Sequence, residues 1–241
     1  MLTYQTEWLC RTEMLVNPDN MAKLRSSHVL VVGLGGVGAY AAEMICRAGV
    51  GRLTIIDGDC VQPSNRNRQL LALCSNDGRR KTEIMEERLR DINPELQLET
   101  ISEYIHDQAL IEIASLQYDY VVDAIDTLSP KIFLLYYSLK NKNKIVSSMG
   151  AGGKLDPLKI QIDDISKTQV CSLACSVRKR LRKLGVTTGI KTVFSTEPIN
   201  KKLVVACEEQ NKRSVVGTIS YMPAIFGCIC ASVVIRDLCG R

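Results

Sequence analysis

Four glycines lie between an apolar segment and a segment with helical spacing. They form the motif Gly-x-Gly-Gly-x-Gly, at Gly33, Gly35, Gly36 and Gly38. Glycines in this context permit a tight turn and let the backbone approach a phosphate, while the following helix offers free N–H groups. Asp57 lies 19 residues after Gly38, where a carboxylate accepts hydrogen bonds from a ribose, and Asp59 follows it. This pattern predicts a nucleotide site; the alternative is a glycine turn that binds nothing.

Fixed cations follow the second apolar segment of the chain. Arg68 lies between Asn65 and Gln69 in the segment 65–69, and Lys81 begins the next helical pattern. A dinucleotide carries about two charges on its pyrophosphate, whereas a triphosphate carries about four and needs cations that bridge phosphoryl oxygens. The cations therefore favour a nucleoside triphosphate over the dinucleotide of an NAD-dependent oxidoreductase, which stays a rival. As isolated residues, Arg68 and Lys81 would also fit solvated surface charges.

Two acidic residues lie at the end of the fourth predicted strand. Asp123 is the last residue of that strand, and Asp126 follows three residues later. In an open α/β sheet this is the edge at which ligands bind. A carboxylate there suits Mg²⁺ held against phosphates, and we assign that role to Asp126. The alternative is that Asp123 or Asp126 caps the following helix.

The elements that must position these residues alternate between strand and helix. Five strands are expected at 28–32, 52–57, 96–101, 120–123 and 144–147, and helices at 38–49, 77–93, 107–116 and 130–142. This order predicts a doubly wound, mostly parallel α/β sheet with right-handed crossovers. The segment 1–150 is then the nucleotide-binding core of a single domain, 1–241. In its α+β elaboration, 151–241, we expect strands at 160–165, 192–196 and 203–207, a loop at 168–174, and helices at 176–184 and 220–238.

Composition narrows the class of protein further. The 241 residues are 46% hydrophobic and 24% charged, which fits a globular protein and excludes collagen and disorder. The net charge of +5 permits an acidic partner without requiring one. No secretory signal is evident, so we expect a cytoplasmic protein with reduced thiols. The uncharged segment 219–235 contains Pro223 and Gly227 and fits a buried helix better than a membrane span, although peripheral membrane contact stays open.

The ten cysteines include no Cys-x-x-Cys pair, and there are two histidines, so we expect no zinc site. Cys171 and Cys175 precede or begin a basic segment that would lower a thiol pKa. No general base lies near them in sequence, which favours structural thiols over a catalytic cysteine. The basic segment itself fits either contacts with nucleic-acid phosphates or a solvated helix face, and its candidate contact residues are Arg178, Arg180, Arg182 and Lys183.

Taken together, these motifs resemble the adenylation domain of the ubiquitin-activating-enzyme-like (ThiF/MoeB/HesA) family, from about Arg11 to the C-terminus. The resemblance implies that the glycine loop binds Mg-ATP together with Asp57, Asp59, Asn65 and Gln69. It implies phosphate contacts for Lys81 and Arg68 and a magnesium ligand in Asp126. It also implies a homodimer in which Arg11 reaches across into the partner's ATP site. Thr127 stands where the family has asparagine.

Within that family, the segments 148–157, 167–174, 193–197 and 217–223 resemble the tRNA-modifying branch. Members of that branch close the threonylcarbamoyl group on adenosine 37 of tRNA into a ring. The resemblance implies an ATP-dependent enzyme that adenylates the threonine carboxylate; the carbamoyl part then attacks within the same group and expels AMP. Activation of a ubiquitin-like or sulfur-carrier protein stays an alternative, as does a scaffold that binds ATP without turnover. An accessory or sulfur-transfer partner stays open.

Overall fold

A seven-stranded sheet forms the centre of the protein. The computed structural model describes residues 4–105, 107–199, 204–206 and 214–241. The sheet strands are β1 His28–Val32, β2 Arg52–Ile56, β3 Gln97–Ile101, β4 Tyr120–Asp123, β5 Ile145–Ser148, β6 Ile160–Asp164 and β7 Lys191–Ser195. Their order is β3-β2-β1-β4-β5-β7-β6, with all neighbours parallel except β6 and β7. The predicted α/β class and parallel sheet are confirmed.

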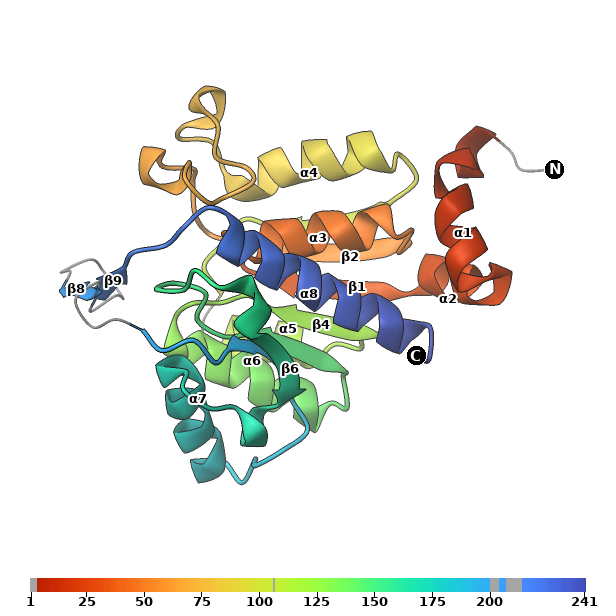
Figure 1. Cartoon of the computed structure of the whole chain (residues 1–241). Coiled ribbons are helices and arrows are strands. Elements are labelled where there is room, and N and C mark those ends of the chain that lie inside the picture. The colour runs from red at the N-terminus through yellow and green to blue at the C-terminus, as the bar shows by residue number, and fades with distance from the viewer. Residues whose placement is uncertain (1–3, 106, 200–203, 207–213) are drawn as a thin grey trace.

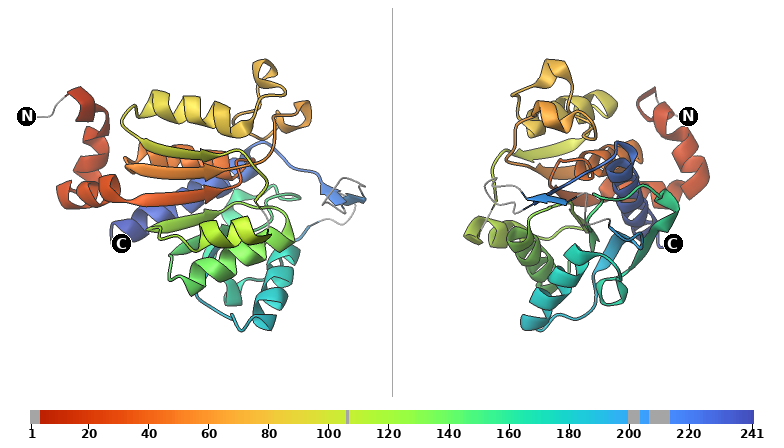
Figure 2. Two further views of the ribbon diagram at one scale, coloured as in Figure 1. Left: turned by 180° about the vertical axis from the view of Figure 1, so that it is seen from behind. Right: turned by 60° about the vertical axis from the view of Figure 1, so that its left-hand side comes forward.

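Helices cover both faces of the sheet (Figures 1 and 2). The helices are α1 Cys10–Val16, α2 Pro18–Ser26, α3 Gly38–Arg47, α4 Lys81–Ile92, α5 Asp107–Ala114, α6 Leu128–Lys140, α7 Ser172–Lys183 and α8 Tyr221–Leu238. Side chains of α3, α4 and α8 share one apolar cluster with the sheet, and those of α5, α6 and α7 share a second. Strands buried on both faces carry continuous apolar runs, which is why β1 and β4 were readable from sequence.

Strand order reverses between β1 and β4. From β1 the chain moves outward to β2 and β3, then returns through α5 to β4 on the other side of β1. Loops that leave the carboxyl ends of β1 and β4 therefore diverge to opposite faces, which opens a crevice at this point of the sheet edge. For this reason the glycine loop packs against Ala124, two residues before Asp126.

Helix α8 packs deeply against the sheet and α3. Phe226, Cys230 and Val234 recur at helical spacing and are fully buried. A Cβ at Gly227 would lie 2.3 Å from the carbonyl oxygen of Val37, so glycine lets α8 and α3 approach closely. This helix is long and apolar enough to cross a membrane, and 44% of its residues are buried within the protein, which fits the buried helix that was predicted.

The structure contains helices that the sequence analysis did not predict, and some boundaries differ. Helices α1 and α2 meet at Asn17, whose side chain accepts a hydrogen bond from the Asn20 N–H at 2.9 Å and caps α2. The helix expected at 77–93 begins at Lys81, because Gly78 (φ +80°) keeps the preceding turn out of helical geometry. Helix α7 begins four residues before the expected 176, so Cys175 lies within the helix rather than before it.

A second, two-stranded sheet lies apart from the first. Strand β8, Val204–Ala206, falls within the strand expected at 203–207 and pairs antiparallel with β9, Ser214–Val216, which was not predicted. The ribbon places this pair beyond the carboxyl edge of the main sheet, on the side of the glycine loop (Figure 1). The chain then returns from β9 to α8.

Candidate nucleotide site

The glycine loop is packed tightly against its neighbours. Gly33 has φ +92°, and a Cβ there would lie 2.8 Å from the carbonyl oxygen of Ala124. A Cβ at Gly38 would lie 1.7 Å from the carbonyl oxygen of Gly33, and one at Gly36 would lie 2.8 Å from Cβ of Pro223. At Gly35, by contrast, the nearest atom would be Nε2 of Gln69 at 3.9 Å. The protein itself does not require glycine at this position, whereas a ligand approaching the backbone would.

Asp57 is held at the carboxyl end of β2 by the glycine loop and by its own loop. Its carboxylate accepts hydrogen bonds from the backbone N–H of Leu34 at 2.6 Å and of Asp59 at 2.7 Å. Lys81 Nζ lies 3.9 Å from Oδ1 of Asp57 and 2.7 Å from Oδ2 of Asp59. Burial raises the pKa of Asp57, while the charge of Lys81 and the two N–H donors oppose that rise. A buried lysine and an oriented carboxylate thus lie side by side.

Arg68 and Gln69 extend from a loop built around Asn65. The backbone N–H groups of Arg68 and Gln69 both donate to the carbonyl oxygen of Asn65, at 3.1 and 2.9 Å. The side chain of Asn65 accepts from the backbone N–H of Gln62 and so closes the start of this loop. Arg68 Nη1 donates to the carbonyl oxygen of Ser64 at 2.9 Å and to Oδ1 of Asn67 at 2.8 Å. The motif residues are therefore organised by the backbone before any ligand arrives.

Gln69 carries an orphaned acceptor. Its Oε1 is buried and has no hydrogen-bond partner within the part of the chain that the structure describes. Buried polar atoms are normally paired, so an unpaired oxygen beside a glycine loop fits a donor group on a bound nucleotide. This observation supports the assignment of Gln69 to the nucleotide site.

A buried ion pair fixes the loop that carries Asp126. The side chains of Asp123 and Lys131 are fully buried and 2.7 Å apart. Lys131 Nζ also donates to the carbonyl oxygens of Ile125 at 3.0 Å and Ser148 at 2.8 Å. The hydroxyl of Ser147 donates to Asp123 Oδ2 at 2.5 Å, and the N–H of Ile125 donates to Oδ1 at 3.1 Å. Asp123 is thus committed to the protein, whereas Asp126 lies three residues on with an exposed side chain.

The sequence analysis did not single out Lys131. The sequence feature that could have identified it is a lysine among the apolar residues of a predicted helix, near Ile132 and Leu134. A lysine buried on such a face needs an acidic partner, and Asp123 at the end of the preceding strand is the one it meets. Of the two acids, Asp123 is the buried one with a lysine partner, and Asp126 is the exposed one.

Comparison with known proteins identifies the family of this chain. A model of the ThiF family matches residues 9–241. The chain belongs to the ThiF family. A protein of Bacillus subtilis named tRNA threonylcarbamoyladenosine dehydratase is 37% identical over 236 residues, which cover 95% of this chain and 93% of that protein. The solved structure of an E. coli tRNA N6-threonylcarbamoyladenosine dehydratase in complex with ATP is 34% identical, with a TM-score of 0.89, and the match covers 98% of this chain and 95% of that chain.

A different branch of relatives matches a smaller part of this ThiF-family chain. The sulfur carrier protein ThiS adenylyltransferase of E. coli is 34% identical over 139 residues, which cover 57% of this chain and 55% of that protein. Similarity to the dehydratases therefore extends over nearly the whole chain, whereas similarity to the carrier-protein activator covers 57% of it.

Arg11 does not reach the nucleotide site of its own chain. It lies on α1, whose neighbours Leu9 and Met21 pack around Gly49 just beyond the end of α3. The glycine loop is at the opposite end of α3, so α1, which carries Arg11, lies at the edge of the sheet far from the glycine loop (Figure 1).

The basic helix α7 does not present all its cations in the same way. Arg178 Nη1 donates to the carbonyl oxygen of Thr168 at 2.8 Å and also contacts the Thr168 hydroxyl, so it braces the preceding loop. Arg180 Nη1 lies 3.2 Å from the hydroxyl of Ser129 in the first turn of α6. The side chains of Arg182 and Lys183 are exposed. Of the four candidates, Arg178 is therefore used within the protein, whereas Arg180, Arg182 and Lys183 are exposed.

The cysteines of the described residues are all free thiols, nine in number. Cys171 is buried at the start of α7, and Cys175 lies one turn further along the helix. Among the residues that the structure covers, no three His, Cys, Asp or Glu side chains gather into one group.

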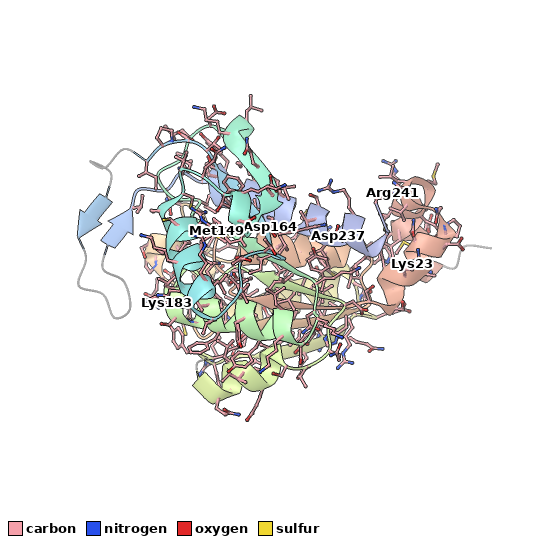
Figure 3. All side chains as sticks on the ribbon, turned by 90° about the horizontal axis from the view of Figure 1, so that it is seen from below. Lys23, Met149, Asp164, Lys183, Asp237 and Arg241 are labelled. Atoms are coloured by element: carbon pink, nitrogen blue, oxygen red, sulfur yellow. The ribbon has the colours of Figure 1, made fainter. Side chains whose placement is uncertain are left out.

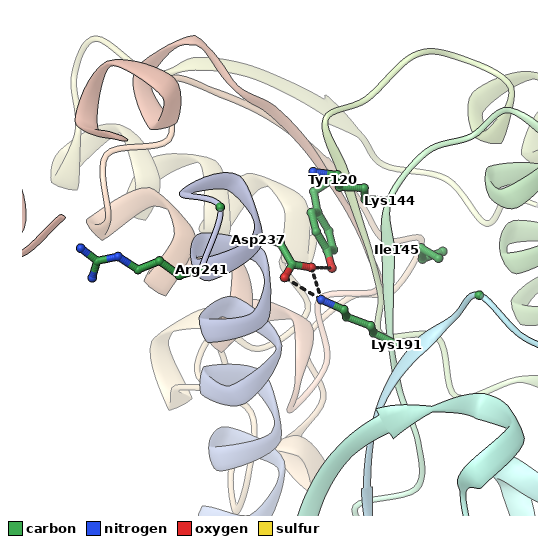
Figure 4. Close-up of a pocket in the computed structure, with 8 residues that line it drawn as sticks. Tyr120, Lys144, Ile145, Lys191, Asp237 and Arg241 are labelled. Atoms are coloured by element: carbon green, nitrogen blue, oxygen red, sulfur yellow. Dashed lines mark hydrogen bonds and ion pairs between the residues drawn. The ribbon is translucent and has the colours of Figure 1, made fainter. Parts of the chain in front are cut away.

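The hollow drawn in Figure 4 lies at the other edge of the sheet. It is lined by Tyr120 and Ile145, the first residues of β4 and β5, and by Lys191 and Asp237. Both carboxylate oxygens of Asp237 accept from Lys191 Nζ, at 2.6 and 2.7 Å, and one accepts from the Tyr120 hydroxyl at 2.7 Å. These bonds fasten α8 to the sheet. In Figure 3, Asp237 and Arg241 lie toward the N-terminal helices, whereas Lys183 lies on the side of the β8–β9 pair.

Proposed function

We propose that this ThiF-family chain is an ATP-dependent tRNA threonylcarbamoyladenosine dehydratase. The observation that carries the proposal is the convergence, at one edge of the sheet, of the glycine loop, Asp57, Arg68, Lys81 and Asp126. Similarity to named dehydratases over nearly the whole chain supports the choice of substrate. A tRNA substrate fits a cytoplasmic enzyme.

The chemistry divides into two displacements. The threonine carboxylate attacks the α-phosphorus of ATP, pyrophosphate leaves, and an acyl adenylate forms. The carbamoyl part of the same group then attacks the activated carbonyl and expels AMP, which closes the ring with net loss of water. Because the attacking group is already tethered, the protein need not supply a nucleophile. This is consistent with structural roles for Cys171 and Cys175.

Each side chain of the site has a role in the first displacement. Asp57, supported by Asp59, accepts from the ribose, and Gln69 Oε1 accepts from a nucleotide donor. Lys81 positions the phosphates, and Arg68 stabilises charge that develops on them in the transition state. Asn65 holds Arg68 and Gln69 in place through its backbone.

Magnesium fits the acid that the fold leaves exposed. A carboxylate oxygen is a hard ligand suited to Mg²⁺, and Asp123 is already saturated by Lys131 and its neighbours. We therefore assign Asp126 to Mg²⁺, which when bound offsets phosphate charge.

A homodimer would complete the site with Arg11 of the partner subunit. Exposed apolar residues on or beside α1 support an interface there: Trp8, Met14 and Leu15 are 40%, 85% and 73% exposed. An accessory or sulfur-transfer partner is compatible with this arrangement but is not required by it.

Mixing two inactive variants should restore activity if Arg11 acts across a dimer. Arg11→Ala and Arg68→Ala each disable every site in their own homodimers. In a mixed dimer one site combines an intact Arg68 with the intact Arg11 of the other subunit. We expect tRNA-dependent AMP formation to reappear in co-refolded mixtures, approaching about a quarter of the wild-type rate for random pairing of equal amounts, in which half of the dimers are mixed and each has one intact site. Mixtures as inactive as either parent would reject the trans role.

The outward cations of α7 are the proposed tRNA contacts. The segment 165–196 contains seven Lys or Arg residues and no Asp or Glu. Arg180 joins it to the first turn of α6, three residues beyond Asp126. These observations support a positive surface beside the site, formed by Arg180, Arg182 and Lys183, with Arg178 holding the preceding loop.

Removing two of these cations should weaken tRNA binding in a salt-dependent way. For Arg182→Ala/Lys183→Ala, the slope of log K against log salt should fall by about 0.7–0.9 for each tRNA phosphate that the variant no longer binds. Filter binding at several salt concentrations measures this slope. The matched control is Lys140→Ala/Lys144→Ala, a basic pair on another surface, and an equal change in that control would show a merely general charge effect.

The deciding experiment is nucleoside mass spectrometry of tRNA after incubation with the protein and Mg-ATP. The modified adenosine should lose the mass of one water, and AMP should form in equal amount. Pyrophosphate exchange that needs a protein ending in Gly-Gly instead of tRNA would favour the carrier-protein activator. ATP binding without any turnover would indicate a scaffold, and hydride transfer to NAD would indicate an oxidoreductase.

A further inference from the structure

A short segment joins β9 to α8 and lies against the nucleotide site. We call residues 216–223 the strap. On one side, the carbonyl oxygen of Gly217 accepts from the N–H of Gly153 at 2.8 Å, and the hydroxyl of Tyr221 donates to the carbonyl oxygen of Leu155 at 2.8 Å. On the other side, Pro223 packs against Gly36 of the glycine loop. The strap therefore connects the loop after β5, the β8–β9 pair and the phosphate-binding turn.

A second link joins the strap to Arg68 through one side chain. Asn67 Nδ2 donates to the carbonyl oxygen of Thr218 in the strap at 2.9 Å. Oδ1 of the same amide accepts from Arg68 Nη1 at 2.8 Å. The two ends of one small, rigid amide thus contact the strap and the phosphate-binding arginine. A displacement of Thr218 changes where the acceptor for Arg68 lies.

We propose that Asn67 is a positioning residue that couples the strap to Arg68, so that tRNA seated against the strap and ATP seated on Arg68 bind cooperatively. The inference rests on the proposed function, because it takes the tRNA to be the substrate that lies beside the strap. In the structure, Arg68 Nη1 is shared between the carbonyl oxygen of Ser64 and Oδ1 of Asn67. The phosphates of ATP must compete with those two acceptors for Arg68 Nη1. If Asn67 moves with the strap, one of the competing acceptors moves away and Arg68 binds phosphate more readily.

The test measures the affinity of a non-hydrolysable ATP analogue with and without substrate tRNA. In the wild-type protein tRNA should tighten analogue binding about 5-fold or more, and the analogue should tighten tRNA binding by the same factor. Asn67→Ala removes both links. Asn67→Asp keeps an acceptor for Arg68 but removes the donor to Thr218. In both variants the coupling factor should fall toward 1, and since each factor is a ratio within one variant, direct charge effects on ATP cancel.

The control is Asn76→Asp, which makes the same chemical change in the same region. Asn76 Nδ2 donates to the carbonyl oxygen of Leu71 and does not bridge to the strap. Its coupling factor should stay at the wild-type value. A merely structural role for Asn67 would lower stability yet leave the factor unchanged, and that result overturns the proposal.

A second measurement does not depend on tRNA. Backbone hydrogen exchange in the strap should slow when the analogue binds wild-type protein and should respond less in Asn67→Ala. Unchanged exchange in the wild-type strap overturns the link. If tRNA fails to bind at all while the exchange result holds, the substrate assignment fails and the coupling to tRNA falls with it, whereas the contact between strap and Arg68 survives.

Discussion

Arg68→Ala and Asp126→Ala are each expected to reduce tRNA-dependent AMP formation by about 10²–10³-fold or more while leaving the fold intact. In the proposed mechanism, the guanidinium of Arg68 would stabilise charge that grows on the transferring phosphoryl group, and Asp126 would hold a Mg²⁺ ion that offsets phosphate charge. Neither side chain is part of the apolar core, so melting temperatures should stay close to that of the wild type. A coupled assay for AMP and a thermal melt for each variant measure the two quantities.

The matched control for Arg68→Ala lies two residues away in the same loop. Arg66 is exposed and forms an ion pair with Asp77. Exposed pairs of this kind contribute little to stability. Arg66→Ala should therefore retain nearly full activity. Equal losses in the two arginine variants would assign the effect to the loop as a whole, and full activity in Arg68→Ala would remove that residue from the mechanism.

Lys131→Met is expected to destabilise the protein by about 3–5 kcal/mol, because it leaves the buried carboxylate of Asp123 without its cation. The same change releases the carbonyl oxygens of Ile125 and Ser148, so the loop before Asp126 loses its anchor. We expect activity to fall as well, with a raised Mg²⁺ requirement. Urea unfolding measures the free energy of unfolding.

Two further variants separate the ion pair from the helix. Lys140→Met replaces an exposed lysine at the other end of α6 and should change stability by only about 0.5 kcal/mol or less. Asp123→Asn/Lys131→Met removes both charges while keeping an acceptor for the N–H of Ile125. It should recover part of the loss, because residues in contact are not additive. The comparison includes Asp123→Asn alone, and a double variant whose loss equals the sum of the losses in Asp123→Asn and Lys131→Met would contradict a direct pair.

Much of the fold followed from local patterns. Buried parallel strands such as β1 and β4 are short apolar runs, and the glycine motif predicts the turn from β1 into α3. The predicted boundary was wrong where a turn precedes a helix, as at Lys81, because the charged residues Asp77, Arg79 and Arg80 suit a helix whereas Gly78 interrupts it. Helices α1 and α2 were missed because they are short, and because their buried residues Val16, Met21 and Leu24 join a cluster that includes α8, which lies at the other end of the sequence.

The sequence by itself determined which chemistry this protein is equipped for. Gly33 to Gly38, Asp57, Arg68, Lys81 and Asp126 have types and spacings that suit a nucleoside triphosphate, because turn geometry and charge are local properties. Only the tertiary structure decided which partners those residues have and which of them are exposed. It saturated Asp123 with Lys131, left Asp126 exposed, set Arg11 at the far edge, and brought the strap to Asn67. Such pairings join residues up to 151 positions apart, and they depend on strand order and packing, which no local pattern encodes.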